Sequence, residues 1–299
     1  MVDQSLEREA VSAVDKTRVL IGFVSVESAE RMIRQSESFW ETRHDVDVER
    51  RDVESLMATA EEGIRPLDEP IDEVDIRPLP DDPEVEVHIE DLTGQEFFQQ
   101  VYGEDPTAYE IGLVPIDKLI ARQASVTVTG HREIPEWESD LLGVIQYTLP
   151  AEREQGVFQQ AIQSSDDKLV GYQFTSRAPN IQLQNASVVQ TGNPMEKGVF
   201  FTLRAPPNVT NVWRVDGRLV LNNGYHRTYQ LLQQGETHVP AVIRDADALP
   251  TAGDFTEEQL LGDRPPVLTD FESDAATTIK KPATNDVIRI TAETTEVYR

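Results

Sequence analysis

The chain has 299 residues, of which 54 are acidic and 27 basic, and its formal net charge is -27. It contains no cysteine, which excludes disulfides, thiolate nucleophiles and cysteine-ligated metals. The longest apolar run, 19–24, is far shorter than the ~20 residues of a membrane span. The N-terminus has neither a basic region nor an apolar segment, so we expect no signal peptide, no membrane contact and a cytoplasmic location.

The kind of charge is as informative as its amount. Lysine occupies only six positions, and the other 21 basic residues are arginine. At about 1 M salt the Debye length is only ~3 Å, so crowded carboxylates barely repel one another. We therefore predict a halophilic protein; the alternative is an acidic interaction surface or tail in an ordinary cell. In a halophilic protein, acidity is no evidence against binding a nucleotide or nucleic acid.

The N-terminal part is predicted to be helical. The apolar run 19–24 indicates a short buried strand or the start of a helix. Ser25 or Ser28 can cap a helix that reaches Trp40, because short polar side chains accept hydrogen bonds from first-turn N–H groups. A second, weaker helix is expected over 53–60.

Proline punctuates the next segment. Five prolines alternate with Asp and Glu between residues 66 and 91, and proline blocks helices while acidic residues favour solvent. We therefore expect an extended acidic linker or arm over 66–92. Near its end, Val85, Val87 and Ile89 alternate with polar residues, which predicts a short strand.

A strand-rich body follows. Thr93 is expected to cap a short helix whose inward face carries Phe97, Phe98 and Val101, and another helix is expected over 137–147. The predicted strands are 111–116, 124–129, 169–175, 181–190, 198–204, 209–215, 218–222, 239–243 and 287–290.

These patterns predict an α+β protein with a strand-rich central domain. The predicted divisions are a helical N-terminal region (1–65), an acidic Pro-rich linker or arm (66–92), an α+β core (93–250) and a C-terminal extension (251–299).

One segment of the core has chemical character. Residues 218–221 predict a strand, and the Asn-Asn-Gly turn at 222–224 tolerates positive φ. Residues 225–234 predict a helix, which Gly235 would end, and a further strand follows at 239–243.

Two cationic residues stand in the first turn of that helix. His226 and Arg227 lie where unpaired N–H groups and the helix dipole are already positive. A cation there costs about 0.3–1 kcal/mol unless an anion is near. The pattern therefore indicates an anion site, and its occupant is either a phosphate or a carboxylate of this chain.

The same residues resemble a family. The strand, Gly-x-His-Arg turn, helix and Val-Pro strand are similar to the second motif of the ParB/sulfiredoxin superfamily, and residues 114–120 (Val-Pro-Ile-Asp-Lys-Leu-Ile) resemble the opening strand of ParB-like domains. The resemblance implies that Gly224, His226 and Arg227 contact nucleotide phosphates, with Asn223 shaping the turn. It thus implies a ParB/sulfiredoxin-like element within the core and a nucleotide as possible ligand.

The resemblance covers about a tenth of the chain and has departures. Tyr225 stands where sulfiredoxins carry a catalytic cysteine, so sulfiredoxin chemistry is excluded. A long strand-rich stretch separates the two motifs, which ParB-like domains place closer together, and no helix-turn-helix is evident.

Other constellations are weaker. His131 and Arg132 follow a predicted strand and echo the later His-Arg pair, so they either contribute to the same pocket or form a polar turn. The five histidines have no metal-ligand spacing, and we predict no metal site. A P-loop, a nucleophile elbow and a dinucleotide fingerprint are all missing from the sequence.

The sequence therefore leads to two hypotheses. The first is a protein that binds a phosphate-bearing ligand, nucleotide or nucleic acid, with Arg227 as a fixed fork and His226 as a hydrogen-bond donor or general acid. Whether it catalyses a reaction, nuclease cleavage included, is not decided. The alternative is a non-catalytic structural or assembly protein, viral origin included, that meets protein partners through 1–92 and in which the turn is only a fold element.

Overall fold

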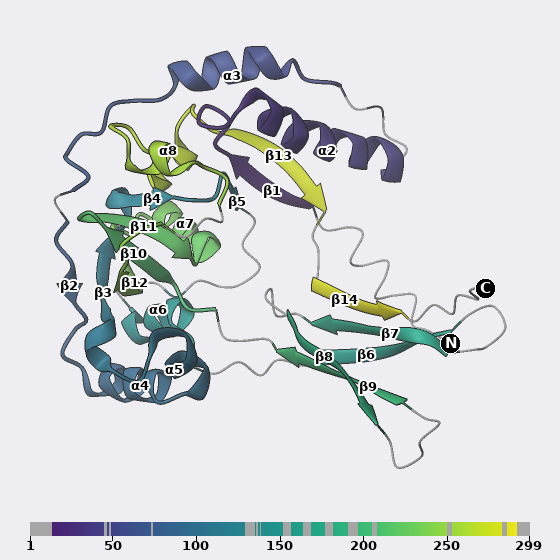
Figure 1. Ribbon diagram of the computed structural model, residues 1–299. Helices are drawn as coiled ribbons and strands as arrows, with labels where there is room; N and C mark the ends of the chain where they lie inside the picture. Colours follow the sequence, from purple (N-terminus) through teal and green to yellow (C-terminus); the bar gives the residue numbers. More distant parts are fainter. Residues whose placement is uncertain are drawn as a thin grey trace. The chain divides into compact units, whose positions relative to one another are not determined.

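The computed structural model divides into two compact units (Figure 1). Unit 1 comprises Met1–Ala151 and Asn208–Ala283, and unit 2 comprises Glu152–Pro207 and Thr284–Arg299. Unit 2 thus begins inside the region predicted as one core. The structure describes residues 14–44, 47, 49–72, 74–128, 135, 137, 139–151, 157–163, 169–176, 182–190, 197–204, 208–249, 253–282 and 286–291.

The described elements confirm an α+β chain. The α-helices are α2 (Val26–His44), α3 (Val53–Glu62), α4 (Pro83–Thr93), α5 (Glu96–Tyr102), α6 (Leu141–Thr148), α7 (Tyr225–Gln233) and α8 (Glu257–Leu261). Short 3-10 turns are η1 (Pro106–Ala108), η2 (Ile116–Lys118) and η3 (Leu268–Glu272). The strands are β1 (Val14–Val19), β2 (Arg77–Pro78), β3 (Glu110–Pro115), β4 (Leu119–Ala121), β5 (Ser125–Thr127), β6 (Val157–Gln163), β7 (Leu169–Ser176), β8 (Gln182–Gln190), β9 (Lys197–Arg204), β10 (Asn211–Val215), β11 (Arg218–Asn223), β12 (His238–Asp245), β13 (Thr277–Pro282) and β14 (Asp286–Thr291).

A six-stranded mixed sheet organises unit 1, in the order β2-β3-β12-β10-β11-β4. Its two faces belong to different hydrophobic clusters, as the side chains of β12 show. Ala241 and Ile243 enter a large cluster with α7, α2 and α3, whereas Val242 between them packs with α4, α5 and α6. Successive residues of a strand point to opposite faces, so helices cover this sheet on both sides.

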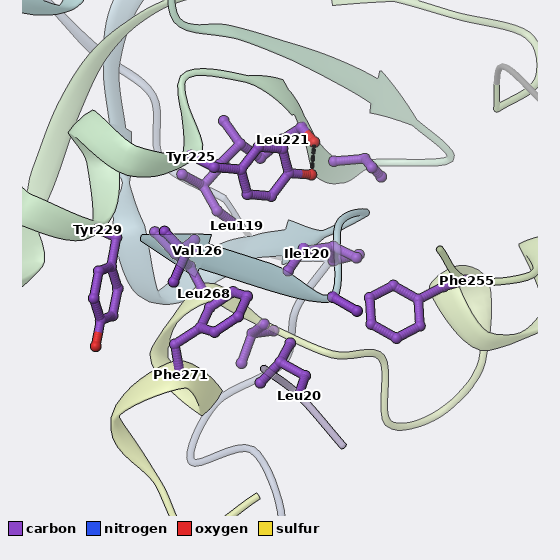
Figure 2. Packing of buried hydrophobic residues seen from close by; sticks show 14 of the residues in the cluster. Leu20, Leu119, Ile120, Val126, Leu221, Tyr225, Tyr229, Phe255, Leu268 and Phe271 are labelled. Atoms are coloured by element: carbon purple, nitrogen blue, oxygen red, sulfur yellow. Dashed lines mark hydrogen bonds between the residues drawn. The ribbon is translucent and has the colours of Figure 1, made fainter. Parts of the chain in front are cut away.

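A smaller three-stranded sheet, β13-β1-β5, joins the large cluster. Figure 2 shows Leu20, beyond β1, packed with Val126 of β5 and Phe271 of η3, beside Leu119 and Ile120 of β4. Segments far apart in sequence therefore share one core.

The N-terminal strand differs from the prediction. The strand is Val14–Val19, and the apolar run after it forms a turn whose residues Leu20 and Ile21 are fully buried. A run of apolar residues reports burial rather than strand geometry, and here a buried turn needs them. The helix expected after Ser25 is confirmed as α2, and the Ser25 hydroxyl accepts the Ser28 N–H at 3.2 Å.

The strand predicted over 85–89 is wrong, because α4 occupies that segment. Asp82 accepts the N–H groups of Glu84 and Val85, and Pro83 stands at the first helical position, where its missing N–H costs nothing. Val85 and Leu92 are buried seven residues apart, while Val87 is 58% exposed. The burial thus follows the helical period, and three alternating residues were too few to define a strand.

The next helix is shifted as well. Thr93 is the last residue of α4 and not the cap of α5, which begins at Glu96 after Gln95. Phe98 is fully buried as expected, but Val101 is 50% exposed. The expected inward position of Val101 is therefore wrong.

Most of the later elements are confirmed within one to three residues. The helix expected over 137–147 starts only at Leu141, because Asp140 caps it by accepting the Gly143 N–H at 2.8 Å. The pattern did not predict β4, β6 or β13.

In unit 2, the sheet β14-β7-β6 and the hairpin β8-β9 are all antiparallel. Among the described residues, no helix is both long and apolar enough to cross a bilayer.

Replacing Asp82 tests the helix that the proline-rich pattern concealed. We expect Asp82→Ala to lower the free energy of unfolding by about 0.5–2 kcal/mol, because two first-turn N–H groups of α4 lose their acceptor. The measurement is denaturant unfolding in molar KCl followed by circular dichroism. The exposed neighbour Asp81 provides the control, and equal losses for Asp81→Ala and Asp82→Ala would contradict the capping role.

Candidate functional site

The candidate site is the turn that joins β11 to α7. Gly224 is the residue before the helix and has φ +97°, a left-handed conformation that glycine adopts without strain. A Cβ atom added to it would lie 2.5 Å from the Thr210 hydroxyl oxygen. Both the backbone angle and the space therefore require glycine at this position.

Asparagine side chains hold the turn to the start of β10. The Asn222 amide donates to Asn211 Oδ1 at 2.7 Å, and the Asn223 amide donates to Asn208 Oδ1. Asn223 also accepts the Gly224 N–H through its own Oδ1 at 2.9 Å. The predicted role of Asn223 in shaping the turn matches these contacts.

Tyr225 links the start of α7 to the end of β11 and to the chain after β4, and Figure 2 shows its hydroxyl bonded to Leu221. Its hydroxyl donates to the Leu221 carbonyl and accepts the N–H groups of Arg122 at 2.7 Å and Gln123 at 3.2 Å. Burial raises the pKa of the Tyr225 hydroxyl above its usual value, so it stays protonated and keeps donating to Leu221. The phenol of Tyr225 thus has a structural task at the position where sulfiredoxins carry a catalytic cysteine.

Arg227 points into the protein. Its side chain donates to the carbonyls of Tyr147 at 2.8 Å, Thr148 at 3.0 Å and Asn208, and the residue is 8% exposed. Two of these carbonyls belong to the last turn of α6, where the helix leaves C=O groups unpaired. Arg227 therefore caps α6 from α7 and ties both helices to the strand entering the sheet.

His226 lies on the solvent side of the same turn. Its ring is exposed, and Nδ1 accepts the Thr127 N–H at 2.9 Å. A ring nitrogen that accepts a hydrogen bond carries no proton, so the neutral ring is protonated at Nε2. The imidazole is thereby held beside the N-terminus of α7.

The N-terminus of α7 differs from the other helix starts. Side-chain caps or first-turn acidic residues serve α2, α3, α4, α5, α6 and α8. Among the described α-helices, α7 alone has neither. In a chain with 54 acidic residues, the positive end of this helix is left without a carboxylate from its own first turn.

A buried hydroxyl lies against this helix end. Thr210 is fully buried and touches Gly224, and its Oγ1 has no hydrogen-bond partner in the described part of the chain. Buried hydroxyls are normally paired. The orphan hydroxyl thus marks the same point in the fold as the uncapped helix.

Sequence reasoning missed Arg122, which follows β4. Its guanidinium carbon lies 4.8 Å from the centre of the Trp213 ring, and Nε is buried without an acceptor among the described residues. Its significance depends on neighbours distant in sequence, so no local pattern could have indicated it.

The two segments that resemble the ParB/sulfiredoxin superfamily lie in one sheet. β3 pairs with β12, and β4 pairs in parallel with β11, so 110–121 flanks the later segment on both sides. Lys118, which lies between β3 and β4 along the chain, donates to Glu69 at 2.9 Å and to the Pro70 carbonyl. His131 and Arg132 lie outside the described residues.

Comparisons with protein-family models, with curated proteins and with solved structures gave no significant match for this chain. Among the described residues, no group of three or more His, Asp or Glu side chains is placed to hold a metal.

Removing the Tyr225 hydroxyl tests its structural task. We expect Tyr225→Phe to lower the free energy of unfolding by about 1–3 kcal/mol, because the N–H groups of Arg122 and Gln123 lose their acceptor. Tyr109→Phe is the matched control, since that ring packs on Phe98 while its hydroxyl has no bond in the described structure. Equal unfolding midpoints for Tyr225→Phe and wild type would refute the assignment.

Proposed function

We propose that this is a halophilic, cytoplasmic protein that binds a phosphate-bearing ligand, a nucleotide or nucleic acid, at the N-terminus of α7. The observation that carries the proposal is the uncapped start of α7, which has no acidic residue in its first turn. The first-turn N–H groups and the exposed His226 ring would hold the phosphate. The proposal concerns binding and assigns no reaction.

The arrangement of the sheet supports this place for a ligand. β4 and β11 are neighbouring parallel strands, and ligands of open sheets bind outside the carboxyl ends of such strands. The adjacency of β3, β4, β11, α7 and β12 also supports the ParB/sulfiredoxin-like element as the fold of this region. The proposal thus rests on one helix end, one strand edge and one family resemblance that coincide.

In this proposal Arg227 is not a direct phosphate contact, which is the role that the family resemblance implies. Its side chain holds three backbone carbonyls and is almost fully buried, so it positions the turn and adds positive charge from within. Replacing it would disturb α6 and α7 together. A binding test is therefore better made on His226.

Thermal unfolding in about 2–3 M KCl, where surface charge is screened, tests the proposal. We expect ATP, AMP or a short DNA to stabilise the wild type, because a ligand at 100 times its Kd adds about 2.7 kcal/mol. The stabilisation should shrink in His226→Ala and persist in His238→Ala, which removes an imidazole at the start of β12 instead. Absence of any shift in the wild type would overturn the proposal and leave the resemblance to the family as a sequence pattern only.

A second candidate function, assembly with other chains, is favoured by the charge of unit 2. Strands β6, β7, β8 and β9 contain no acidic residue, and residues 152–207 carry five acidic and five basic residues. In a chain of net charge -27, residues 152–207 have no net charge and lack the acidity of the rest. That composition suits a surface covered by another protein.

Light scattering coupled to size-exclusion chromatography in molar KCl tests the assembly. We expect a mass of two or more chains. Gln159→Glu/Gln160→Glu should reduce it to one, since adjacent strand residues face opposite sides and one of them must meet a covered face. Circular dichroism checks that the variant keeps its strands, and a monomeric wild type would exclude self-assembly.

A further inference from the structure

A cavity of about 740 Å³ lies where the second half of α2 meets the edge strand β13 (Figure 1). Its wall includes three carboxylates, those of Glu37, Asp47 and Glu49, together with Trp40. Trp40 Nε1 donates to the Lys280 carbonyl at 2.9 Å, which fixes the indole between helix and strand. An aromatic side chain and several acids therefore share one hollow of unit 1.

Glu37 differs from the other buried carboxylate of the described chain. Glu37 is 4% exposed and Asp270 is 5% exposed. Asp270 binds Arg264 through both oxygens and also accepts the Val267 N–H. Glu37 Oε1 accepts the N–H and Nε of Arg51 at 3.1 and 3.3 Å, but Oε2 is buried without any donor in the described structure. A buried carboxylate oxygen that has lost its water and has no donor is costly to the fold.

The cations of the cavity wall do not supply the missing donor. Arg51 is already engaged by Glu37 Oε1 and by a carbonyl of β13 at 3.1 Å. Lys16 and Lys280 are exposed and lie opposite each other on β1 and β13, whereas the neighbouring pair of Thr17 and Ile279 is buried. Successive side chains of a strand leave from opposite faces, so both lysines leave from the exposed face of the sheet.

The remaining wall groups favour an organic cation as the partner. The three carboxylates do not converge, since no group of three acids in the described part of the chain is placed to hold a metal. A cation that reaches Glu37 must therefore bring its own hydrogen-bond donors. An indole attracts such a cation within about 6 Å of its ring, and an alkyl stem can pack on apolar side chains.

We infer that this cavity binds an organic cation with N–H donors, a primary ammonium or a guanidinium on an alkyl stem. The head group donates to Glu37 Oε2 in a charge-assisted hydrogen bond, and the stem lies against Trp40. Asp47 and Glu49 are exposed and add negative potential on the solvent side. The inference does not depend on the phosphate site at α7.

Isothermal titration of the full chain in molar KCl with three small cations tests the inference. Butylammonium and butylguanidinium carry N–H donors, whereas tetramethylammonium has the charge without a donor. We expect the first two to bind at least about tenfold more tightly than the third, because a hydrogen bond between charged groups is worth that factor or more.

Glu37→Gln is the decisive variant. The amide keeps an acceptor for Arg51 but replaces the acceptor Oε2 with an NH₂ group. We expect it to weaken butylammonium binding at least about tenfold. Glu41→Gln is the matched control, because it makes the same change one turn further along α2, where Glu41 is exposed and pairs with Arg50 at 2.8 Å. Its affinity should stay within about twofold of the wild type.

A second variant keeps the test valid if Glu37→Gln does not fold, which circular dichroism checks. Asp47→Asn/Glu49→Gln changes only exposed side chains of the wall, and we expect it to weaken butylammonium binding about two- to fivefold. Equal affinities of this double variant and the wild type would contradict the inference in that case.

The head group occurs both in free polyamines and on basic side chains of partner proteins. Titration with putrescine and with acetyl-arginine-methylamide separates these sources: tighter binding of putrescine assigns a free amine, and tighter binding of the blocked arginine assigns a partner's side chain. A wild type that binds none of these cations would overturn the inference. Equal affinities of Glu37→Gln and Glu41→Gln, or of butylammonium and tetramethylammonium, would overturn it as well.

Discussion

The hydroxyl of Tyr225 is the interaction on which the candidate site depends. It joins the end of β11 to the main chain that follows β4, through one donated and two accepted hydrogen bonds. Because the group is buried, each of those bonds is worth more than at the surface, and losing one leaves an unpaired backbone group. The contact thus connects the main chain of Arg122, the first residue of α7 and the end of β11, beside the parallel pairing of β4 with β11. The turn between β11 and α7 is therefore held in place by hydrogen bonds of the protein itself.

The N-terminus of α7 differs from those of the other described helices in its acidic residues and caps. In a chain with 54 acidic residues, helix N-termini are favourable places for Asp and Glu because the helix dipole stabilises the negative charge. Five of the described helices follow that rule with first-turn acids, and α6 uses an Asp cap. At α7 the chain instead places His226 and Arg227, and the cost of Arg227 is offset by the carbonyls at the end of α6. The first turn of α7 has no acidic residue, although the chain has 54, so the overall composition does not account for this helix end.

Much of this region was predictable from sequence and some of it was not. The strand–turn–helix–strand from β11 to β12 was evident because glycines at 224 and 235 mark both ends of a helix with a clear apolar face. The strand predicted at 85–89 failed because the cap at Asp82 and the first-turn proline outweighed three alternating residues. The inward direction of Arg227 could not be predicted, since two of its three acceptors lie about 80 residues away along the chain. The contact of Arg122 with Trp213 was missed for the same reason, because the two residues are far apart in sequence.

The long stretch between the two family-like segments now has a physical account. β3 and β4 precede the insertion and β10 to β12 follow it, yet all lie in one sheet, so the intervening chain leaves the fold and returns without interrupting the ladder. Much of that stretch is residues 152–207 of unit 2, which carry five acidic and five basic residues, whereas unit 1 is strongly acidic. Solvent exposure in concentrated salt favours acidic surface, whereas contact with another macromolecule does not require it. The two units therefore differ in composition: unit 1 is strongly acidic, whereas strands β6, β7, β8 and β9 of unit 2 contain no acidic residue. A ligand site in unit 1 and a partner surface in unit 2 are compatible in a single chain, and the charge distribution is the reason to test them separately.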